Sequence, residues 1–308
     1  WNSSRFVMMK MDESKTTNNW LVTPDIQHPQ DRWILSRLNA TTNKVNSRMK
    51  NFQFGEAQLI THDFIWNEYC DWYIEMAKIR LRNNDMAPID VLPYVLEKTM
   101  RLLHPFMPFL TETIWQNLTK KLPGSTYTEL SANTPALIIA SYPEADNSLL
   151  DEKAEQDISS VIEIVKAIRN FRSEFRIKQS TKINVKVQTK SDMEMLAQQS
   201  ETIKNLAFVK SLIIEHPGDV DPNEASLVLE QSTVVISLSG LVDVETEKRR
   251  LLDELEEHNR NESQTRGKLG NKQFTSKAPE EVIQREEDKL HRILERKERL
   301  DEIIRQLS

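Results

Sequence analysis

The sequence predicts a mostly α-helical chain, made of a helical bundle, a small α/β module and an antiparallel coiled-coil hairpin. Only 6 of the 308 residues are glycine, which leaves few tight turns and favours helices. Apolar residues recur at helical spacing through most of the first region and at heptad spacing in the last, while short alternating stretches between them indicate strands. We expect the domains to cover residues 1–150, 151–240 and 241–308.

A bundle of helices is predicted over residues 31–150. We expect Asp31 to cap the first helix, because a carboxylate accepts hydrogen bonds from the free N–H groups of a first turn. A second helix, with an unusually aromatic face, is expected from about Gly55 to Arg82. The apolar positions that carry these two helices are Trp33, Ile34, Leu38 and Val45, then Phe64, Tyr69, Trp72 and Tyr73.

Prolines divide the remainder of this bundle. Pro88 suits the first turn of a third helix, where its missing N–H costs nothing. Pro105 and Pro108 should interrupt that helix further on, because each lacks the donor that the helix needs. Residues 122–136 (LPGSTYTELSANTPA) contain many turn-forming residues and are predicted to form a surface loop.

The middle region changes to an alternating pattern. Ile183, Val185 and Val187 alternate with polar residues, which predicts a half-buried strand. Together with three further strand-like stretches, it predicts a small antiparallel or mixed sheet. The other expected elements are helices over 162–175 and near 192–207, and strands at 210–216, 225–231 and 233–239.

The last region carries a heptad pattern on both sides of a basic loop. Neither arm can bury its apolar seam alone, so we expect two helices, each roughly 40 Å long, to fold back on one another. Pro279 followed by Glu280 and Glu281 suits a helix start, since acids favour the positive end of the dipole. The seam positions are Leu241, Val244, Leu251, Leu255 and Leu269, then Ile283, Leu290, Ile293, Leu300, Ile304 and Leu307.

Catalytic and metal-binding motifs are missing from the sequence. The 6 histidines and the single cysteine show no metal-ligand spacing, and there is no phosphate-binding glycine loop or nucleophile elbow. We interpret His104 as a structural histidine and Cys70 as a small buried hydrophobic residue. No apolar run is long enough to span a bilayer. We therefore expect no catalytic residue, no metal site and no cofactor in this chain.

Two local basic patches are candidates for a polyanion site, because a net charge of −6 excludes a global positive field. The first is the hairpin loop, where five basic residues and one acid lie between Arg260 and Lys277. Lysines there can neutralise phosphates and an aromatic ring can pack on a base. Alternatively, Leu269 and the ring close the hairpin end while the lysines only keep the tip hydrated. The candidates are Arg266, Lys268, Lys272, Phe274 and Lys277.

The second patch lies on the helix expected over 162–175 and just beyond it. Lys166, Arg169, Arg172 and Arg176 follow one another at spacings of three and four, which places them on one helix face. Such a face can track a phosphate backbone. It can equally be an ordinary solvated face, and the residues alone leave both interpretations open.

Four stretches resemble the C-terminal region of valyl-tRNA synthetases: WNSSRFV, DRWILSRLN, FIWNEYCDWYIEMAK and LLHPFMPFLTETIW. The segment HPFMPFLTETIW is shared by the related valine, isoleucine and leucine enzymes, whereas EYCDWYIE and KLGNKQFTSKAPEEVI look valine-type. The resemblance covers nearly the whole chain and is weakest across 180–240.

The resemblance implies an anticodon-binding bundle over 1–150, a linking module over 151–240, and a tRNA-binding arm over 241–308 that reaches the tRNA elbow. It implies a monomeric, cytoplasmic parent enzyme that charges tRNA with valine using ATP and magnesium, without a membrane partner. The class I signature motifs are absent, since MKMDESK lacks the KMSK order. With Trp1 as its first residue, we expect an inactive fragment of a longer protein.

The resemblance also implies an anticodon site. Arg5 and Phe6 match its start, where an aromatic ring can stack on an unstacked base. The helix around Trp72, Tyr73 and Ile74 would wall the same site. For Phe6 the alternative is packing onto the bundle. For the whole chain the alternatives are a free-standing tRNA- or RNA-binding protein and a dimerising coiled-coil module.

Overall fold

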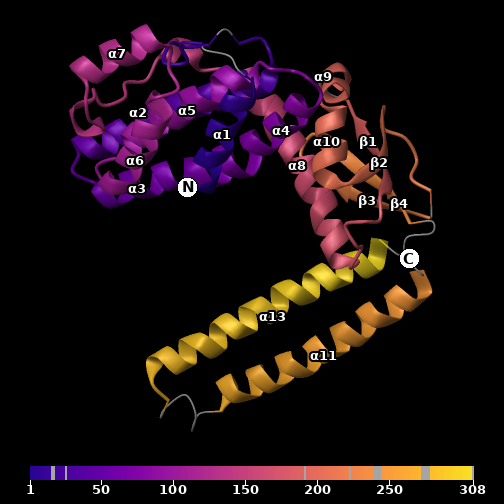
Figure 1. Ribbon diagram of the computed structural model, residues 1–308. Coiled ribbons are helices and arrows are strands. Elements are labelled where there is room, and N and C mark those ends of the chain that lie inside the picture. Colours follow the sequence, from indigo (N-terminus) through magenta and orange to yellow (C-terminus); the bar gives the residue numbers. More distant parts are fainter. Residues whose placement is uncertain are drawn as a thin grey trace. The chain divides into compact units, whose positions relative to one another are not determined.

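The computed structural model describes residues 1–14, 18–24, 26–190, 192–221, 223–238, 244–271 and 278–306. Its elements follow the predicted order of helices, a small sheet with its helices, and two long helices (Figure 1). Contacts group the chain into two compact units, Trp1–Val165 with Gln198–Leu206, and Lys166–Ala197 with Ala207–Ser308. The three domain boundaries expected from the sequence stay a prediction.

The first unit is a helical bundle in which α2 contacts α3 and α5, and α1 packs against α5. Its core is built around the fully buried side chains of Ile34, Phe64 and Trp115. Within the described residues, no helix is long and apolar enough to cross a membrane. The helices are α1 (Asn2–Ser14), α2 (Pro29–Lys50), α3 (Phe54–Asp63), η1 (Phe64–Tyr73), α4 (Ile74–Arg82), α5 (Pro88–Leu103), α6 (Pro108–Thr119) and α7 (Gly124–Asn133), with short 3₁₀ turns η2 (Leu137–Ile139) and η3 (Asn147–Leu149).

The start of α2 differs from the prediction. Its N-cap is His28, whose Nδ1 accepts a hydrogen bond from the backbone N–H of Gln30 at 3.2 Å, and Pro29 occupies the first turn. Asp31 lies in the first turn and is buried, with its carboxylate bonded to Tyr73 and Arg80 instead. The expectation that Asp31 caps this helix was therefore wrong, because tertiary partners claim the carboxylate.

The second predicted helix is one continuous run with a π-helical middle, η1, between α3 and α4. At its end the N–H of Ile74 bonds to the carbonyl of Tyr69, five residues back. The wider turn fits the burial pattern, because Phe64, Tyr69 and Tyr73 are all in the core at spacings of five and four. The segment quoted above for its resemblance, FIWNEYCDWY, is thus the segment with the unusual backbone.

Prolines interrupt the helices as predicted, but residues 122–136 are not a plain loop. Pro108 starts α6 after a break that follows α5. Gly124–Asn133 forms α7, and no residue of this helix is buried. The predicted surface loop was wrong here because this helix buries no residue and so lacks the apolar stripe by which a helical period can be recognised.

The second unit contains a four-stranded mixed sheet in the order β2-β1-β4-β3, which confirms the small α/β module. Strand β1 runs parallel to β2 and antiparallel to β4, so the β1–β2 connection is a crossover that includes two short helices. The boundary between the two units falls within α8. The helix α10 (Ser200–Ala207) and the first part of α8 (Glu152–Glu174) belong to the first unit. The other elements of this region are β1 (Ile183–Thr189), α9 (Met193–Gln198), β2 (Val209–Glu215), β3 (Glu224–Val228) and β4 (Ser232–Ser237).

Helices α11 (Val244–Gly270) and α13 (Glu280–Gln306) form the expected antiparallel hairpin. Figure 1 shows the two helices side by side. Leu251, Ile293 and Leu300 of the predicted seam are buried, and Thr265 is buried with them although the heptad pattern did not include it. Leu255, Leu269, Ile283, Leu290 and Ile304 are half-buried, while Leu241, Leu307 and the side chain of Val244 lie outside the described residues.

Ion pairs join the two arms across this seam. The carboxylate of Glu254 contacts Arg296 at 2.7 Å, and that of Glu262 contacts Lys297 at 2.5 Å. The start of α13 also follows the prediction, because the carbonyl of Pro279 accepts the first helical hydrogen bonds, from Val282 and Ile283. The arms therefore pair with each other through both apolar and charged contacts.

Candidate nucleic-acid interfaces

The surface of α1 carries an aromatic ring between two cations. Phe6 is half-buried, and the Nζ atoms of Lys10 and Lys78 lie 6.0 and 5.1 Å from its ring centroid. Arg5, the other residue predicted here, is exposed. Each ammonium is also shared with a carboxylate on its own helix. Along the outer face of α1, Asn2, Arg5, Phe6, Met8, Met9, Asp12 and Glu13 line an open depression.

Packing of α1 onto the bundle fixes this surface. Ser4, Val7 and Met11 form its buried face at spacings of three and four, which leaves Phe6 at the edge of the contact. Ser3 Oγ lies 3.1 Å from Cys70 Sγ on η1, which ties the start of α1 to the π-helical segment. Arg5 is thus at the surface and Phe6 is partly so, and the expected base contact of Phe6 stays a prediction.

Three residues expected to wall this site are placed elsewhere. Trp72, Tyr73 and Ile74 are buried in the bundle core, and the Tyr73 side chain is 0% exposed. The Tyr73 hydroxyl donates a hydrogen bond to Asp31 Oδ1 at 2.6 Å, so its polar end faces inward. We therefore correct this expectation: these side chains support the helix from within and do not form the contact surface. The cation that lies there instead is Lys78, one turn further along.

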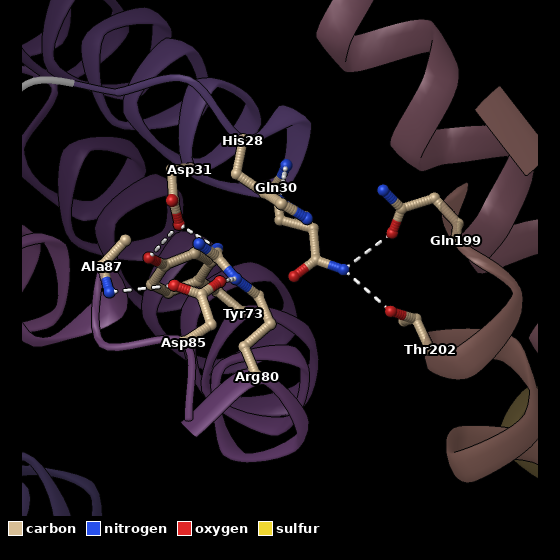
Figure 2. A network of polar contacts seen from close by, with 9 residues as sticks. All are labelled: His28, Gln30, Asp31, Tyr73, Arg80, Asp85, Ala87, Gln199 and Thr202. Atoms are coloured by element: carbon tan, nitrogen blue, oxygen red, sulfur yellow. Dashed lines mark hydrogen bonds and ion pairs between the residues drawn. The ribbon is translucent and has the colours of Figure 1, made fainter. Parts of the chain in front are cut away.

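A buried polar network holds the ends of α2 and α4 together (Figure 2). Arg80 is 7% exposed and donates to Asp31 Oδ1 and Asp85 Oδ2, both at 2.6 Å. Burial works to raise the pKa of Asp85, but the hydrogen bonds from Arg80 and the Ala87 N–H outweigh it and lower that pKa. Figure 2 shows Asp31 and Asp85 in contact with the Arg80 guanidinium, and Asp31 also in contact with Tyr73. These contacts support α4, the helix that bears Lys78.

His28 belongs to the same network as a neutral group. Burial lowers the pKa of its imidazole, and the positive charge of Arg80 lowers it further, against the opposing effect of nearby carboxylates. A histidine whose pKa is depressed on folding binds more protons when unfolded. The stability that it contributes is therefore present above the ordinary histidine pKa of about 6.5 and is lost as pH falls below it.

A second buried contact joins α2 to the helix α10 within the first unit. The Gln30 side-chain amide donates to Gln199 Oε1 at 2.7 Å and to Thr202 Oγ1 at 2.9 Å (Figure 2). All three side chains are buried. Gln30 Oε1 and Gln199 Nε2 are buried without a hydrogen-bond partner, and this costs free energy that offsets part of the contact.

The basic face of α8 is not uniform. Lys166, Arg169 and Arg176 are exposed, as a phosphate-binding face requires. Arg172 is 5% exposed and donates to the carbonyls of Lys178 at 2.6 Å and Thr181 at 2.9 Å. Its expected role as a direct phosphate contact is corrected, because its donors are used inside the fold. Burial lowers the pKa of Arg172, as expected for a cation held by neutral carbonyls.

At the hairpin tip, the described cations have acidic partners. Arg266 contacts Glu262 at 2.7 Å on its own helix, and Lys268 contacts Glu286 at 3.2 Å on the facing helix. Both cations are more than half exposed, so these pairs are weak and open to exchange for phosphate. Lys272, Phe274 and Lys277 lie outside the described residues, and their roles stay predictions.

In the described ranges, no three His, Cys, Asp or Glu side chains are placed to hold a metal ion. His104 is satisfied, with Nδ1 2.8 Å from Thr111 Oγ1, which confirms its structural interpretation. Cys70 is half-buried, and burial raises the pKa of its thiol despite the hydrogen bond with Ser3. A raised thiol pKa disfavours the nucleophilic thiolate.

Sequence reasoning missed the lysines around Phe6. Lys10 follows Phe6 by four residues, so helical spacing alone was enough to find it. Lys78 lies 72 positions later in the chain and shows no such signal. It reaches the ring only because α1 packs beside the run from η1 to α4.

Comparison with known families identifies the class of protein. Residues 31–187, about half of the chain, match the anticodon-binding domain of tRNA ligases. The chain therefore belongs to this family of tRNA-ligase anticodon-binding domains. Residues 243–308, which include both hairpin helices, match the valyl tRNA synthetase tRNA binding arm. Arg5 and Phe6 lie outside both matched ranges.

Curated relatives point to the valine enzymes. The chain is 38% identical to the valine–tRNA ligase of Dehalococcoides mccartyi strain CBDB1, over 97% of this chain and 33% of the relative. It is 36% identical to that of Listeria monocytogenes, over 98% and 34%, and 35% identical to that of Thermotoga maritima, over 100% and 33%. The chain thus resembles the C-terminal region of valine–tRNA ligases, and it spans about a third of the length of these relatives.

Proposed function

We propose that this chain is the tRNA-binding region of a valine–tRNA ligase, in which the bundle binds the anticodon and the hairpin contacts the tRNA elbow. The observation that carries the proposal is the half-buried Phe6 ring flanked by Lys10 and Lys78 on a bundle of the anticodon-binding family. A ring of this kind can stack on an unstacked base while the lysines contact the neighbouring phosphates of the RNA backbone.

The linking module and the hairpin extend the proposed contact along the tRNA. Lys166, Arg169 and Arg176 supply exposed charge on one side of the module, and Arg266 and Lys268 supply it near the hairpin tip. In this proposal the three regions 1–150, 151–240 and 241–308 act as anticodon-binding, linking and elbow-binding domains. Pairing of α11 with α13 across the hairpin favours an arm that is complete within one chain over a dimerising coiled coil.

For the whole protein we propose charging of tRNA with valine from ATP, with magnesium, in a monomeric cytoplasmic enzyme. The chain's own residues need no cofactor in this account and perform no chemical step. Their part is to bind and orient the tRNA, so that discrimination comes from base contacts and affinity from phosphate contacts.

The test is binding of the purified chain to valine tRNA and to an unrelated tRNA, at 50 and 200 mM salt (concentrations of the order used to expose counterion release). We expect tighter binding of valine tRNA at both concentrations, with affinity falling steeply as salt rises. Equal affinity for the two tRNAs would contradict anticodon recognition and would favour a general RNA-binding protein. A molecular mass of two chains in solution, lost when the hairpin is removed without any change in RNA affinity, would favour the coiled-coil interaction module.

A further inference from the structure

One buried arginine, Arg172, donates to backbone carbonyls in two separate segments of the second unit. Arg172 donates to the carbonyls of Lys178 at 2.6 Å, Thr181 at 2.9 Å and Phe208 at 3.5 Å. The first two belong to the turn that links α8 to β1, and the third is the residue before β2. Because all three carbonyls lie within hydrogen-bonding distance of the same guanidinium, the α8–β1 turn and the start of β2 lie next to each other.

The backbone at this meeting point is held in an uncommon conformation. Arg176 and Phe208 have φ values of 51° and 55°, in the left-handed region that side chains other than glycine rarely adopt. At Arg176 the reason is a helix end, since the N–H of Ile177 bonds back to the carbonyl of Arg172 at 2.8 Å. At Phe208 the carbonyl accepts a long and weak hydrogen bond from Arg172, at 3.5 Å. Such positions persist where the surrounding structure determines them.

An aromatic ring and several cations are exposed around this point. The Phe208 side chain is 38% exposed, and the Arg172 guanidinium carbon lies 5.9 Å from its ring centroid. Lys178, Lys182 and Lys210 are exposed, as is Arg176. Throughout the part of the chain that the structure describes, none of these four cations forms an ion pair with a carboxylate.

Two short stretches of the local sequence lack acids. Residues 175–182 (FRIKQSTK) carry three cations and no acid, and residues 207–214 around Phe208 carry Lys210 and no acid, although Glu174 and Glu215 border these stretches. In a chain with a net charge of −6, this local excess of cations favours contact with a polyanion. An exposed ring among cations matches the mixed stacking and charge contacts that nucleic-acid backbones receive.

We propose that the surface formed by Arg176, Lys178, Lys182, Phe208 and Lys210, here called the corner surface, is a further tRNA contact. Its cations neutralise phosphates, and Phe208 packs on an exposed base or ribose. The proposal rests on the proposed function, because the RNA is the tRNA bound by this chain. It also assigns Arg172 a positioning role: this arginine holds the turn and the ring in place and does not itself touch the RNA.

The test uses the 1–308 chain and labelled valine tRNA, with affinities measured by fluorescence anisotropy at several salt concentrations. The variant Phe208→Asn removes the ring but keeps a residue that tolerates the left-handed backbone. Its matched control is Phe52→Asn, since Phe52 has φ of 58° and is 81% exposed on the first unit. Circular dichroism confirms that each variant is folded.

We expect Phe208→Asn to weaken binding about 5- to 150-fold at every salt concentration, the range for loss of one stacked base, with an unchanged salt slope. We expect the Phe52→Asn control to bind as the parent chain does. Parent-like affinity of Phe208→Asn, in a chain that binds valine tRNA, would overturn the ring contact while leaving the proposed function intact. Failure of the parent chain to bind tRNA would instead overturn the proposed function.

The charge contact has a separate signature. Replacing Lys178, Lys182 and Lys210 together by Gln should lower the slope of log affinity against log salt by about 2, because each phosphate contact releases counterions. The control replaces three exposed lysines elsewhere, Lys44, Lys120 and Lys190, and should leave the slope close to that of the parent. An unchanged slope in the first variant, together with loss of binding to poly-glutamate, would show an acidic protein partner instead and would overturn the proposal.

Discussion

Loss of the Arg80 side chain should unfold the bundle far more readily than loss of an exposed arginine. Replacing Arg80 by Met keeps the apolar stem but leaves the carboxylate of Asp31, whose side chain is 2% exposed, without its cation. Removing one partner of a buried ion pair costs about 3–5 kcal/mol, because the remaining charge cannot be hydrated. Tyr73 still donates to Asp31, so the cost should fall at the lower end of that range.

Tryptophan fluorescence is a suitable assay, because all 6 tryptophans lie in the first unit. Unfolding by urea then reports on the bundle alone, even if the second unit unfolds separately. For a unit of this size, 3 kcal/mol corresponds to a drop in melting temperature of roughly 6–12 °C. The matched control is Arg32→Met: Arg32 pairs with Asp151 at 2.6 Å, but its side chain is 40% exposed, so the change should cost less than about 1 kcal/mol.

The double variant Arg80→Met with Asp31→Asn separates the charge from the packing. An asparagine can still accept the bond from Tyr73 but carries no charge, so the double variant should be more stable than Arg80→Met alone. If the single variant lost less than about 1 kcal/mol, or if the double variant were no more stable than the single one, the reasoning about a buried unpaired charge would be refuted.

Three further outcomes follow from the same structure. Phe6→Ala should reduce discrimination between valine tRNA and a tRNA with another anticodon, by about 1–3 kcal/mol for a lost stack, and an equal loss on both tRNAs would indicate misfolding. Replacing Lys268, Lys272 and Lys277 together by Gln should weaken tRNA binding and lower its salt slope by about 2, and an unchanged slope would remove the hairpin tip from the interface. The parent bundle should lose stability as pH falls below about 6.5, whereas His28→Asn, which keeps a capping side chain, should lack this loss in urea titrations at pH 7.5 and 5.5.

Helices and strands were predicted correctly where one apolar periodicity dominates the sequence. The prediction failed where contacts with residues distant in sequence determine the role of a side chain. Alternation around Val185 correctly predicted β1, and the heptads predicted both hairpin arms. Asp31 was predicted to be the N-cap of α2, but its carboxylate accepts a hydrogen bond from Arg80, which is distant in sequence. The helix α7 was missed because none of its residues is buried and its sequence shows no clear apolar period.

The candidate site shows the same division. Spacing placed Arg169, Arg172 and Arg176 on one face, yet Arg172 is buried while the other two are exposed. Arg172 differs from the other two because the turn after α8 brings the carbonyls of Lys178 and Thr181 to its guanidinium. The spacing of the basic residues along the helix does not reveal this contact. Likewise, the resemblance implied that Trp72, Tyr73 and Ile74 wall the anticodon site, whereas these three side chains are buried in the core.

The central claim is that one chain contacts both the anticodon and the elbow of the same tRNA. The most direct measurement is a hydroxyl-radical footprint of valine tRNA with the 1–308 chain. We predict protection of the anticodon loop and of the elbow, with Phe6→Ala restoring cleavage in the anticodon loop alone. Protection confined to one of these regions, or spread evenly over the whole tRNA, would contradict the account.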